Sequence, residues 1–297
     1  MERDVFSTFH PLINFIYFVM IIGCSMFVMY PVFLCLSILG GFSYYYYLKR
    51  NKAFKTLGKM LIPIFVLSLI VNPLFNHQGG TILFYYSTGN PFTLESLVYG
   101  GAAGLMLVSV LSWFSCYQVV MTSDKFIYLF GKVIPSMSLV LSMIFRFVPK
   151  FRIQIEKISN SQKCVGRDVT NGTVKEKAHH GMKILSVMTT WALENSVETA
   201  DSMKSRGYGL RGRTNFSIYR FDTRDRCILA AMCLFGGVTL LGLFTGKISF
   251  YYYPTLVMNK DSVLAVLGYF SYGLLCIFPV TMNLIEDIKW HYLKSEI

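Results

Sequence analysis

The sequence predicts an all-α, polytopic membrane protein with about six transmembrane helices and two long cytoplasmic helices. Hydrophobic residue types make up 54% of its 297 residues, whereas Asp, Glu, Lys and Arg make up only 15%. An average soluble domain carries about 25% charged residues to cover its water-facing surface. The apolar residues fall in long blocks, and the mean hydropathy is +0.48. These observations exclude a soluble enzyme, a disordered tail and a fibrous repeat.

Six apolar blocks are predicted to cross the bilayer, for which a helix needs about 20 residues. They cover roughly residues 12–29, 31–48, 60–75, 96–121, 227–246 and 262–285. Gly100, Gly101 and Gly104 open the fourth block, and small residues of this kind let transmembrane helices approach closely. The blocks contain almost no ionisable residues, which argues against an ion-driven transporter or pump.

The basic residues predict the orientation of the chain. Lys and Arg number 28 against 16 Asp and Glu, a net charge of +12. If the amino terminus is cytoplasmic, 26 of the 28 basic residues lie on the cytoplasmic side, and only Lys247 and Lys260 lie outside. The positive-inside rule therefore places both termini in the cytoplasm. In a soluble protein the same charge would indicate a nucleic acid, but here the lipid bilayer explains it and no nucleic acid is expected.

Three regions follow from this pattern. Residues 1–121 are expected to form a membrane bundle of four spans, residues 122–226 a cytoplasmic region, and residues 227–297 two further spans with a C-terminal tail. The cytoplasmic region is about 100 residues long and carries most of the basic residues.

Helices are also expected within the cytoplasmic region. Residues 133–145 are apolar but short for a span, so they should form a helix in the interface or beneath the bundle. The alternative is that they cross the membrane, which would change the topology. A second helix should start after Pro149, since proline suits the first helical turn. A third should run from about Met182 to Ser205 and stop at Gly207, where a left-handed residue ends the helix.

Enzyme motifs are absent from the sequence. No GxxxxGK[ST] segment is present, so the chain should not bind ATP phosphates itself, and neither HExxH nor GxSxG occurs. Glu194, Glu198 and Asp201 form an acidic row at helical spacing. We interpret the row as a solvated face or as partners for nearby basic residues, not as catalytic groups or metal ligands. No cofactor and no metal are expected.

The strongest local signal is an arginine beside a glycine at each of two predicted helix ends. Arg167 follows Gly166, and Arg206 precedes Gly207, 39 residues later. An arginine at a helix tip can enter a groove on a partner and form bidentate hydrogen bonds with carboxylates or carbonyls. Contact with phospholipid headgroups, or simple solvation, is the alternative.

These residues resemble a known family. Residues 198–209, with Ser205-Arg206-Gly207, are similar to the second signature of the T components of energy-coupling factor transporters, which usually reads Ala-Arg-Gly. These T components are the transmembrane coupling subunits of vitamin and transition-metal uptake systems of the ABC class. Arg146 and Pro149 match the family's Arg-Phe-x-Pro stretch. The first signature departs from the pattern, because Cys164-Val165-Gly166-Arg167 places the arginine two residues later than usual.

The resemblance implies a non-enzymatic coupling subunit in the cell membrane. The tips of two coupling helices would dock in grooves of two ATP-binding cassette subunits, which hydrolyse the ATP. The bodies of these helices would pack against a separate substrate-binding membrane subunit, the S component, which chooses the vitamin or metal ion. The tip residues are Cys164, Gly166, Arg167, Ser205, Arg206 and Gly207. The residues that would support the coupling helices are Arg146, Pro149, Glu194, Glu198 and Asp201.

Two other functions remain open on the sequence. One is a self-contained permease that binds its own solute within the spans. The other is a membrane enzyme that uses Glu194, Glu198 or Asp201 on the cytoplasmic side. Neither of these would co-purify with two ATPase chains and a small membrane partner, whereas the coupling subunit would.

The charge distribution makes a testable prediction about topology. Cysteines introduced near Gly80 and Lys260 are expected to react with a membrane-impermeant maleimide in sealed cells, because both positions lie in segments with few basic residues. A cysteine near Asn171 is expected to react only after the cells are opened. Reaction of the Asn171 position in sealed cells would contradict the orientation.

Overall fold

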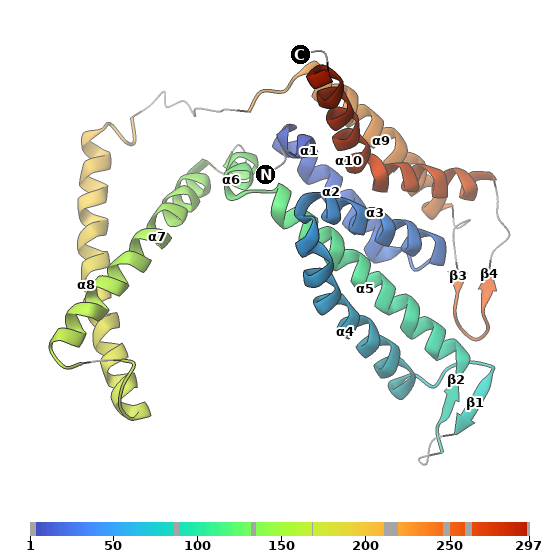
Figure 1. Ribbon diagram of the computed structural model, residues 1–297, viewed down its shortest axis with the longest axis horizontal. Coiled ribbons are helices and arrows are strands. Elements are labelled where there is room, and N and C mark those ends of the chain that lie inside the picture. The colour runs from blue at the N-terminus through green and yellow to red at the C-terminus, as the bar shows by residue number, and fades with distance from the viewer. Residues whose placement is uncertain are drawn as a thin grey trace. The chain divides into compact units, whose positions relative to one another are not determined.

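The computed structural model describes residues 4–85, 89–131, 135–167, 169–210, 219–245, 250–258 and 263–295 (Figure 1). The helices are α1 (Val5–Thr8), α2 (Pro11–Phe27), α3 (Pro31–Lys49), α4 (Asn51–Phe75), α5 (Leu94–Val120), α6 (Ser123–Gly131), α7 (Pro135–Cys164), α8 (Val174–Ser205), α9 (Thr223–Phe244) and α10 (Val263–Ser295). Two short antiparallel hairpins pair β1 (Ile82–Tyr85) with β2 (Pro91–Thr93), and β3 (Phe250–Tyr251) with β4 (Val257–Met258). The all-α prediction is confirmed.

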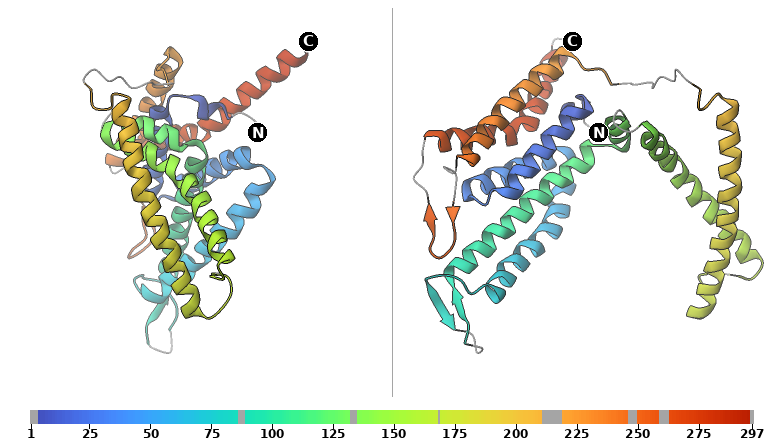
Figure 2. Two further views of the ribbon diagram at one scale, coloured as in Figure 1. Left: turned by 90° about the vertical axis from the view of Figure 1, so that its left-hand side faces the viewer. Right: turned by 180° about the vertical axis from the view of Figure 1, so that it is seen from behind.

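The chain divides into two compact units. One, which we call the bundle unit, comprises residues 1–126 and 219–297, and the other, the arm unit, comprises residues 127–218. Both termini of the chain lie toward one end of the bundle unit and the two hairpins lie at the other (Figure 2). We refer to these as the termini end and the hairpin end.

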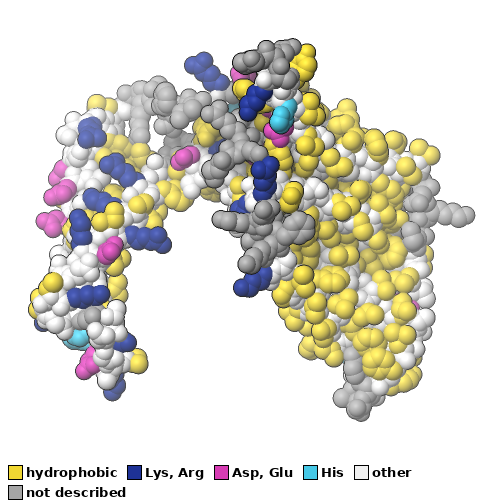
Figure 3. Space-filling model, viewed as in Figure 1, with side chains coloured by type: hydrophobic (Ala, Val, Ile, Leu, Met, Phe, Trp, Pro, Cys, Tyr) yellow, Lys and Arg dark blue, Asp and Glu magenta, His cyan; other side chains and the backbone are white. Residues whose placement is uncertain are grey.

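Among the described residues of the bundle unit, six long apolar helices correspond to the six predicted spans. Helices α3, α4, α5, α9 and α10 contain segments long and apolar enough to cross a membrane. Helix α2 has 17 residues and is about 26 Å long, slightly short of a bilayer core of about 30 Å. Figure 3 shows hydrophobic side chains over most of the visible face of this unit, whereas charged side chains gather on the arm unit.

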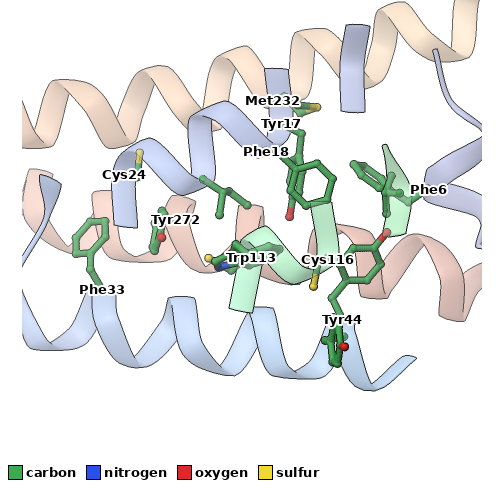
Figure 4. Close-up of a cluster of buried hydrophobic side chains, with 14 of the residues drawn as sticks. Phe6, Tyr17, Phe18, Cys24, Phe33, Tyr44, Trp113, Cys116, Met232 and Tyr272 are labelled. Carbon is green, nitrogen blue, oxygen red and sulfur yellow. The ribbon is translucent and has the colours of Figure 1, made fainter. Parts of the chain in front are cut away.

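Aromatic side chains fill the centre of the bundle unit (Figure 4). Trp113 lies fully buried between helices, and its indole N–H donates to Ser37 Oγ at 2.9 Å. Ser37 Oγ lies 2.5 Å from Ser109 Oγ on α5. The hydroxyl of Tyr17 on α2 donates to the carbonyl of Leu275 on α10 at 2.9 Å. These hydrogen bonds tie α2, α3, α5 and α10 together where hydrocarbon offers no partners.

Helices α4 and α5 approach each other closely at two glycines. A Cβ on Gly104 would lie 2.9 Å from Phe65 Cδ2, and one on Gly100 would lie 2.9 Å from Asn72 Cβ. Ser68 Oγ donates to the carbonyl of Gly100 at 3.0 Å. The close packing predicted for the glycines of this span is therefore confirmed.

Hydrogen bonds of Asp4 and Lys125 hold the helices together at the termini end of the bundle unit. The carboxylate of Asp4 accepts hydrogen bonds from the Tyr44 hydroxyl (2.9 Å) and from Asn283 Nδ2 (2.7 Å). Lys125, in the first turn of α6, is buried and its Nζ donates to the carbonyls of Ser7 (2.6 Å) and Val120 (2.9 Å). Burial lowers the pKa of Lys125 to about 8, an effect that the nearby Asp4 opposes. The start of α6, which leads to the arm unit, is therefore held to the bundle.

The hairpin end is closed by a second set of hydrogen bonds. Glu95, at the start of α5, is almost fully buried, and Oε1 of its carboxylate accepts from the backbone N–H of Thr81 at 3.1 Å and from the Thr81 hydroxyl at 2.7 Å. The Gly80 N–H donates to the carbonyl of Pro254 at 3.0 Å, and Asn76 Nδ2 donates to the Tyr253 hydroxyl at 2.9 Å. The segment between α4 and α5 is thus linked to the segment around β3.

In the arm unit, α7 and α8 cross and share a small core. Ile158 of α7 packs with Ile184 and Met188 of α8. Near this core, Lys150 Nζ donates to Asn195 Oδ1 at 3.0 Å and lies 5.4 Å from the centre of the Trp191 ring. Other apolar side chains stay more than half exposed, among them Val148, Ile153, Leu185, Leu193 and Val197.

The boundaries of the arm helices correct two predictions. Helix α7 continues through Pro149, where we expected a new helix to start. Of the separate helix predicted over residues 133–145, residues 135–145 are part of α7, and residues 133–134 lie outside the described residues. The proline removes one backbone donor, but thirty residues of helix tolerate that loss. Helix α8 begins at Val174, not at Met182. The Thr173 hydroxyl accepts from the Glu176 N–H, and the Glu176 side chain accepts from the Thr173 N–H, so a capping box starts the helix two turns earlier.

The glycine packing between α4 and α5 makes a second prediction. Gly104→Ala is expected to lower the stability of the bundle unit by about 1–3 kcal/mol, the usual cost of overpacking. Gly101→Ala is the matched control, because its Cβ would meet only Leu69 Cδ1, at 3.7 Å. Thermal unfolding in detergent, followed by size exclusion, measures both. Equal unfolding temperatures for the two variants would contradict the close approach.

Candidate docking tips of the arm helices

The C-terminal tip of α8 ends in a glycine cap. Gly207 has φ +80°, a conformation that glycine adopts without strain. Its N–H donates to the carbonyl of Lys204 at 3.0 Å, and the N–H of Tyr208 donates to the carbonyl of Met203 at 3.0 Å. This pair of bonds is the Schellman motif, in which Arg206 is the C-cap residue.

The C-terminal tip of α7 has the same backbone motif. Gly166 has φ +77°. Its N–H donates to the carbonyl of Lys163 at 2.9 Å, and the N–H of Arg167 donates to the carbonyl of Gln162 at 2.9 Å. Both tips therefore end with the same hydrogen-bond pattern around a left-handed glycine.

The two arginines occupy different positions within this shared motif. Arg206 is the C-cap residue, immediately before the glycine, whereas Arg167 follows its glycine. On α7 the C-cap position belongs to Val165, and on α8 the position after the glycine belongs to Tyr208. The sequence signal of two Arg-Gly tips corresponds to one backbone motif but not to one side-chain arrangement.

The tip side chains are accessible. Cys164, Arg167, Ser205 and Arg206 are exposed, and Val165 is 68% exposed. Within the described residues, neither guanidinium has a hydrogen bond or ion pair. The Ser205 hydroxyl bonds only within its own helix, to the carbonyl of Ser202 at 2.9 Å. In the part of the chain that the structure describes, both tips therefore present exposed side chains that another molecule can contact.

The two tips lie at opposite ends of α8. The tip of α7 leads through residues 165–173 into the start of α8, and the second tip follows its last residue, Ser205. Helix α8 has 32 residues and is about 48 Å long. That length separates the two tips by far more than one groove could span, so they are suited to two separate partner sites.

The remaining predicted site residues lie along the arm helices. Arg146 and Pro149 are exposed on α7, and Glu194, Glu198 and Asp201 are exposed on α8. The described residues contain no group of three or more His, Cys, Asp or Glu that could hold a metal ion. The acidic row lies on α8, which ends beside Arg206, and extends toward the C-terminal tip of this helix.

Sequence reasoning did not single out Val165 as the exposed C-cap residue of α7, and it did not find the contact between Lys150 and Trp191. Val165 could have been found by counting positions from each glycine rather than searching for arginine. The Lys150 contact joins residues on two crossing helices, and no local pattern indicates where such helices cross.

Comparison with known proteins identifies relatives. Residues 4–216 match the family described as CbiQ, cobalt transport protein. The chain is similar to proteins named energy-coupling factor transporter transmembrane protein EcfT. The protein from Listeria innocua is 29% identical over 197 residues, covering 61% of this chain and 72% of the relative. That from Brevibacillus brevis is 26% identical over 201 residues (64% and 76%), and that from Lactobacillus helveticus is 31% identical over 114 residues (38% and 41%).

Proposed function

Because this chain belongs to the CbiQ family of cobalt transport proteins, we propose that it is the coupling subunit of an energy-coupling factor transporter. The resemblance to the T components is confirmed by the family match and by the EcfT relatives. In the proposed role, the chain transmits the ATP-driven movement of two ATP-binding cassette subunits to a substrate-binding membrane subunit. It takes no part in ATP hydrolysis itself.

One observation carries this proposal. Two long helices end in the same exposed glycine cap, each with an arginine beside the glycine, and the caps lie at opposite ends of α8. A dimer of ATPases offers two separate grooves, one for each tip. The guanidinium of Arg206 would bind carboxylate or carbonyl oxygens in one groove.

Movement of the tips would reach the membrane through connected helices. When ATP closes the ATPase dimer, the tips move with the grooves, and α8 moves with them as one rigid helix. The contact of Ile158 with Ile184 and Met188 passes this movement to α7. Helix α7 follows α6, whose first turn Lys125 fixes to the bundle unit.

The exposed apolar side chains of the arm helices support a membrane partner. Ile153, Leu185, Leu193 and Val197 are each more than half exposed on α7 and α8. Apolar surface of this kind is stabilised when another protein covers it. We propose that the S component covers part of it and that this subunit selects the vitamin or metal ion.

The orientation and the division of the chain belong to the same proposal. Residues 1–121 and 227–297 would form the membrane part in the cell membrane, with both termini in the cytoplasm. Residues 122–226 would form the cytoplasmic coupling region. The concentration of lysine and arginine in that region supports this orientation.

Arg206→Glu is expected to weaken the attachment of one ATPase subunit and to abolish uptake. Interface anchors of this kind cost about 2 kcal/mol or more when removed, which is roughly a thirty-fold loss of affinity. The bundle unit should remain folded, because Arg206 is exposed outside its core. The measurement is pull-down of the ATPase subunits by the tagged variant in detergent, together with its monodispersity.

Arg152→Glu is the matched control, since Arg152 is exposed on α7 away from both tips and the charge change is the same. It should retain both ATPases. If Arg206→Glu also retains both and still supports ATP-driven uptake, the docking role of this tip is wrong. Uptake by the chain without any ATPase subunit would favour a self-contained permease instead.

A further inference from the structure

The two tips carry their side chains in opposite order around the glycine that caps each helix. On α8 an arginine precedes the glycine and Tyr208 follows it, whereas on α7 Val165 precedes the glycine and an arginine follows it. We propose that Val165, and not Arg167, is the residue that α7 inserts into its partner. The two tips then require grooves of unlike chemistry. This inference rests on the proposed function, in which each tip docks on an ATPase subunit.

Two consecutive positions support an apolar tip on α7. Where α8 carries Ser205 and Arg206, the equivalent residues of α7 are Cys164 and Val165, so a hydroxyl and a guanidinium are replaced by a thiol and an isopropyl group. Val165 is exposed although it is apolar and β-branched. Val174, at the start of α8 and therefore at the same end of the arm unit, is 84% exposed. Covering such side chains removes apolar surface from water.

Arg167 does not occupy the C-cap position of α7. It lies two residues further along the chain, beyond the left-handed glycine, and two residues span up to about 7 Å. A groove that receives the C-cap side chain at its floor would meet Arg167 only at its rim. A rim charge is solvated and contributes mainly to the rate of association, whereas a buried anchor determines affinity.

The groove for α8 should therefore reject the tip of α7. A groove that accepts Arg206 has to present buried carboxylate or carbonyl oxygens, and Val165 would leave those oxygens without donors. Unpaired buried acceptors are costly, and this cost discriminates between partners. The reverse exchange would bury a guanidinium in an apolar groove. We infer that the two ATPase subunits differ in their grooves and that each binds a single tip.

The test uses the tagged full-length chain, co-expressed with the ATP-binding cassette subunits of the same genome and purified in detergent. Val165→Asp is expected to reduce the retained amount of one ATPase subunit at least ten-fold, while the other subunit stays bound. Arg206→Glu is expected to lose only that other subunit, and Arg167→Ala to change the retention of either by less than two-fold.

A gain of binding provides the second arm of the test. Val165→Arg combined with Arg167→Tyr gives α7 the side-chain order of α8 and leaves Gly166 unchanged. This variant should bind two copies of the ATPase subunit that Arg206 holds, which mass photometry can count. The proposal is overturned if Arg167→Ala releases a subunit while Val165→Asp retains both, or if one kind of subunit binds both tips of the unaltered chain. If the unaltered chain binds no ATPase at all, the proposed function itself fails.

Discussion

The bundle unit depends on polar groups finding partners inside the protein, because hydrocarbon surroundings offer none. Trp113, Ser37 and Ser109 satisfy one another at the centre of the unit. At one end the carboxylate of Asp4 accepts hydrogen bonds from the distant residues Tyr44 and Asn283, and at the other the carboxylate of Glu95 accepts from Thr81 in the segment before α5. These bonds fix which helices are neighbours, since aromatic and aliphatic contacts alone would tolerate many arrangements.

The arm unit follows a different rule, since its shape comes from helix ends rather than from a large core. Among its described residues, the buried hydrophobic cluster consists of Ile158, Ile184 and Met188, with a few half-buried side chains around it. The capping box at Thr173 and the two glycine caps determine where its helices begin and end. Because the caps are held by backbone bonds, the side chains beside the glycines are not needed for folding. They can therefore be matched to partners.

Much of this architecture was predictable from the sequence. The apolar blocks predicted six helices at the right places, and the glycines of the fourth block predicted its close packing. Pro149 was misinterpreted because proline is common in a first turn, although a long helix can also contain it. The predicted start of α8 is too late. The residues after Thr173 are mostly polar and show no apolar helical pattern, although the capping box at Thr173 starts a helix there. The bond between Asp4 and Asn283 joins residues 279 positions apart, which no local pattern indicates.

The crossing point on α8 makes this helix a lever with unequal arms. The contact with α7 lies around Ile184 and Met188, and so about 18 Å of helix extends to its start and about 28 Å to its end. Any rotation about this fulcrum displaces the end near Arg206 roughly one and a half times as far as the end near Val174. Under the proposed function, equal displacements applied at the two tips would therefore rotate the helix through different angles. A given force applied by a partner at the longer end would turn the helix with a larger torque than the same force at the shorter end.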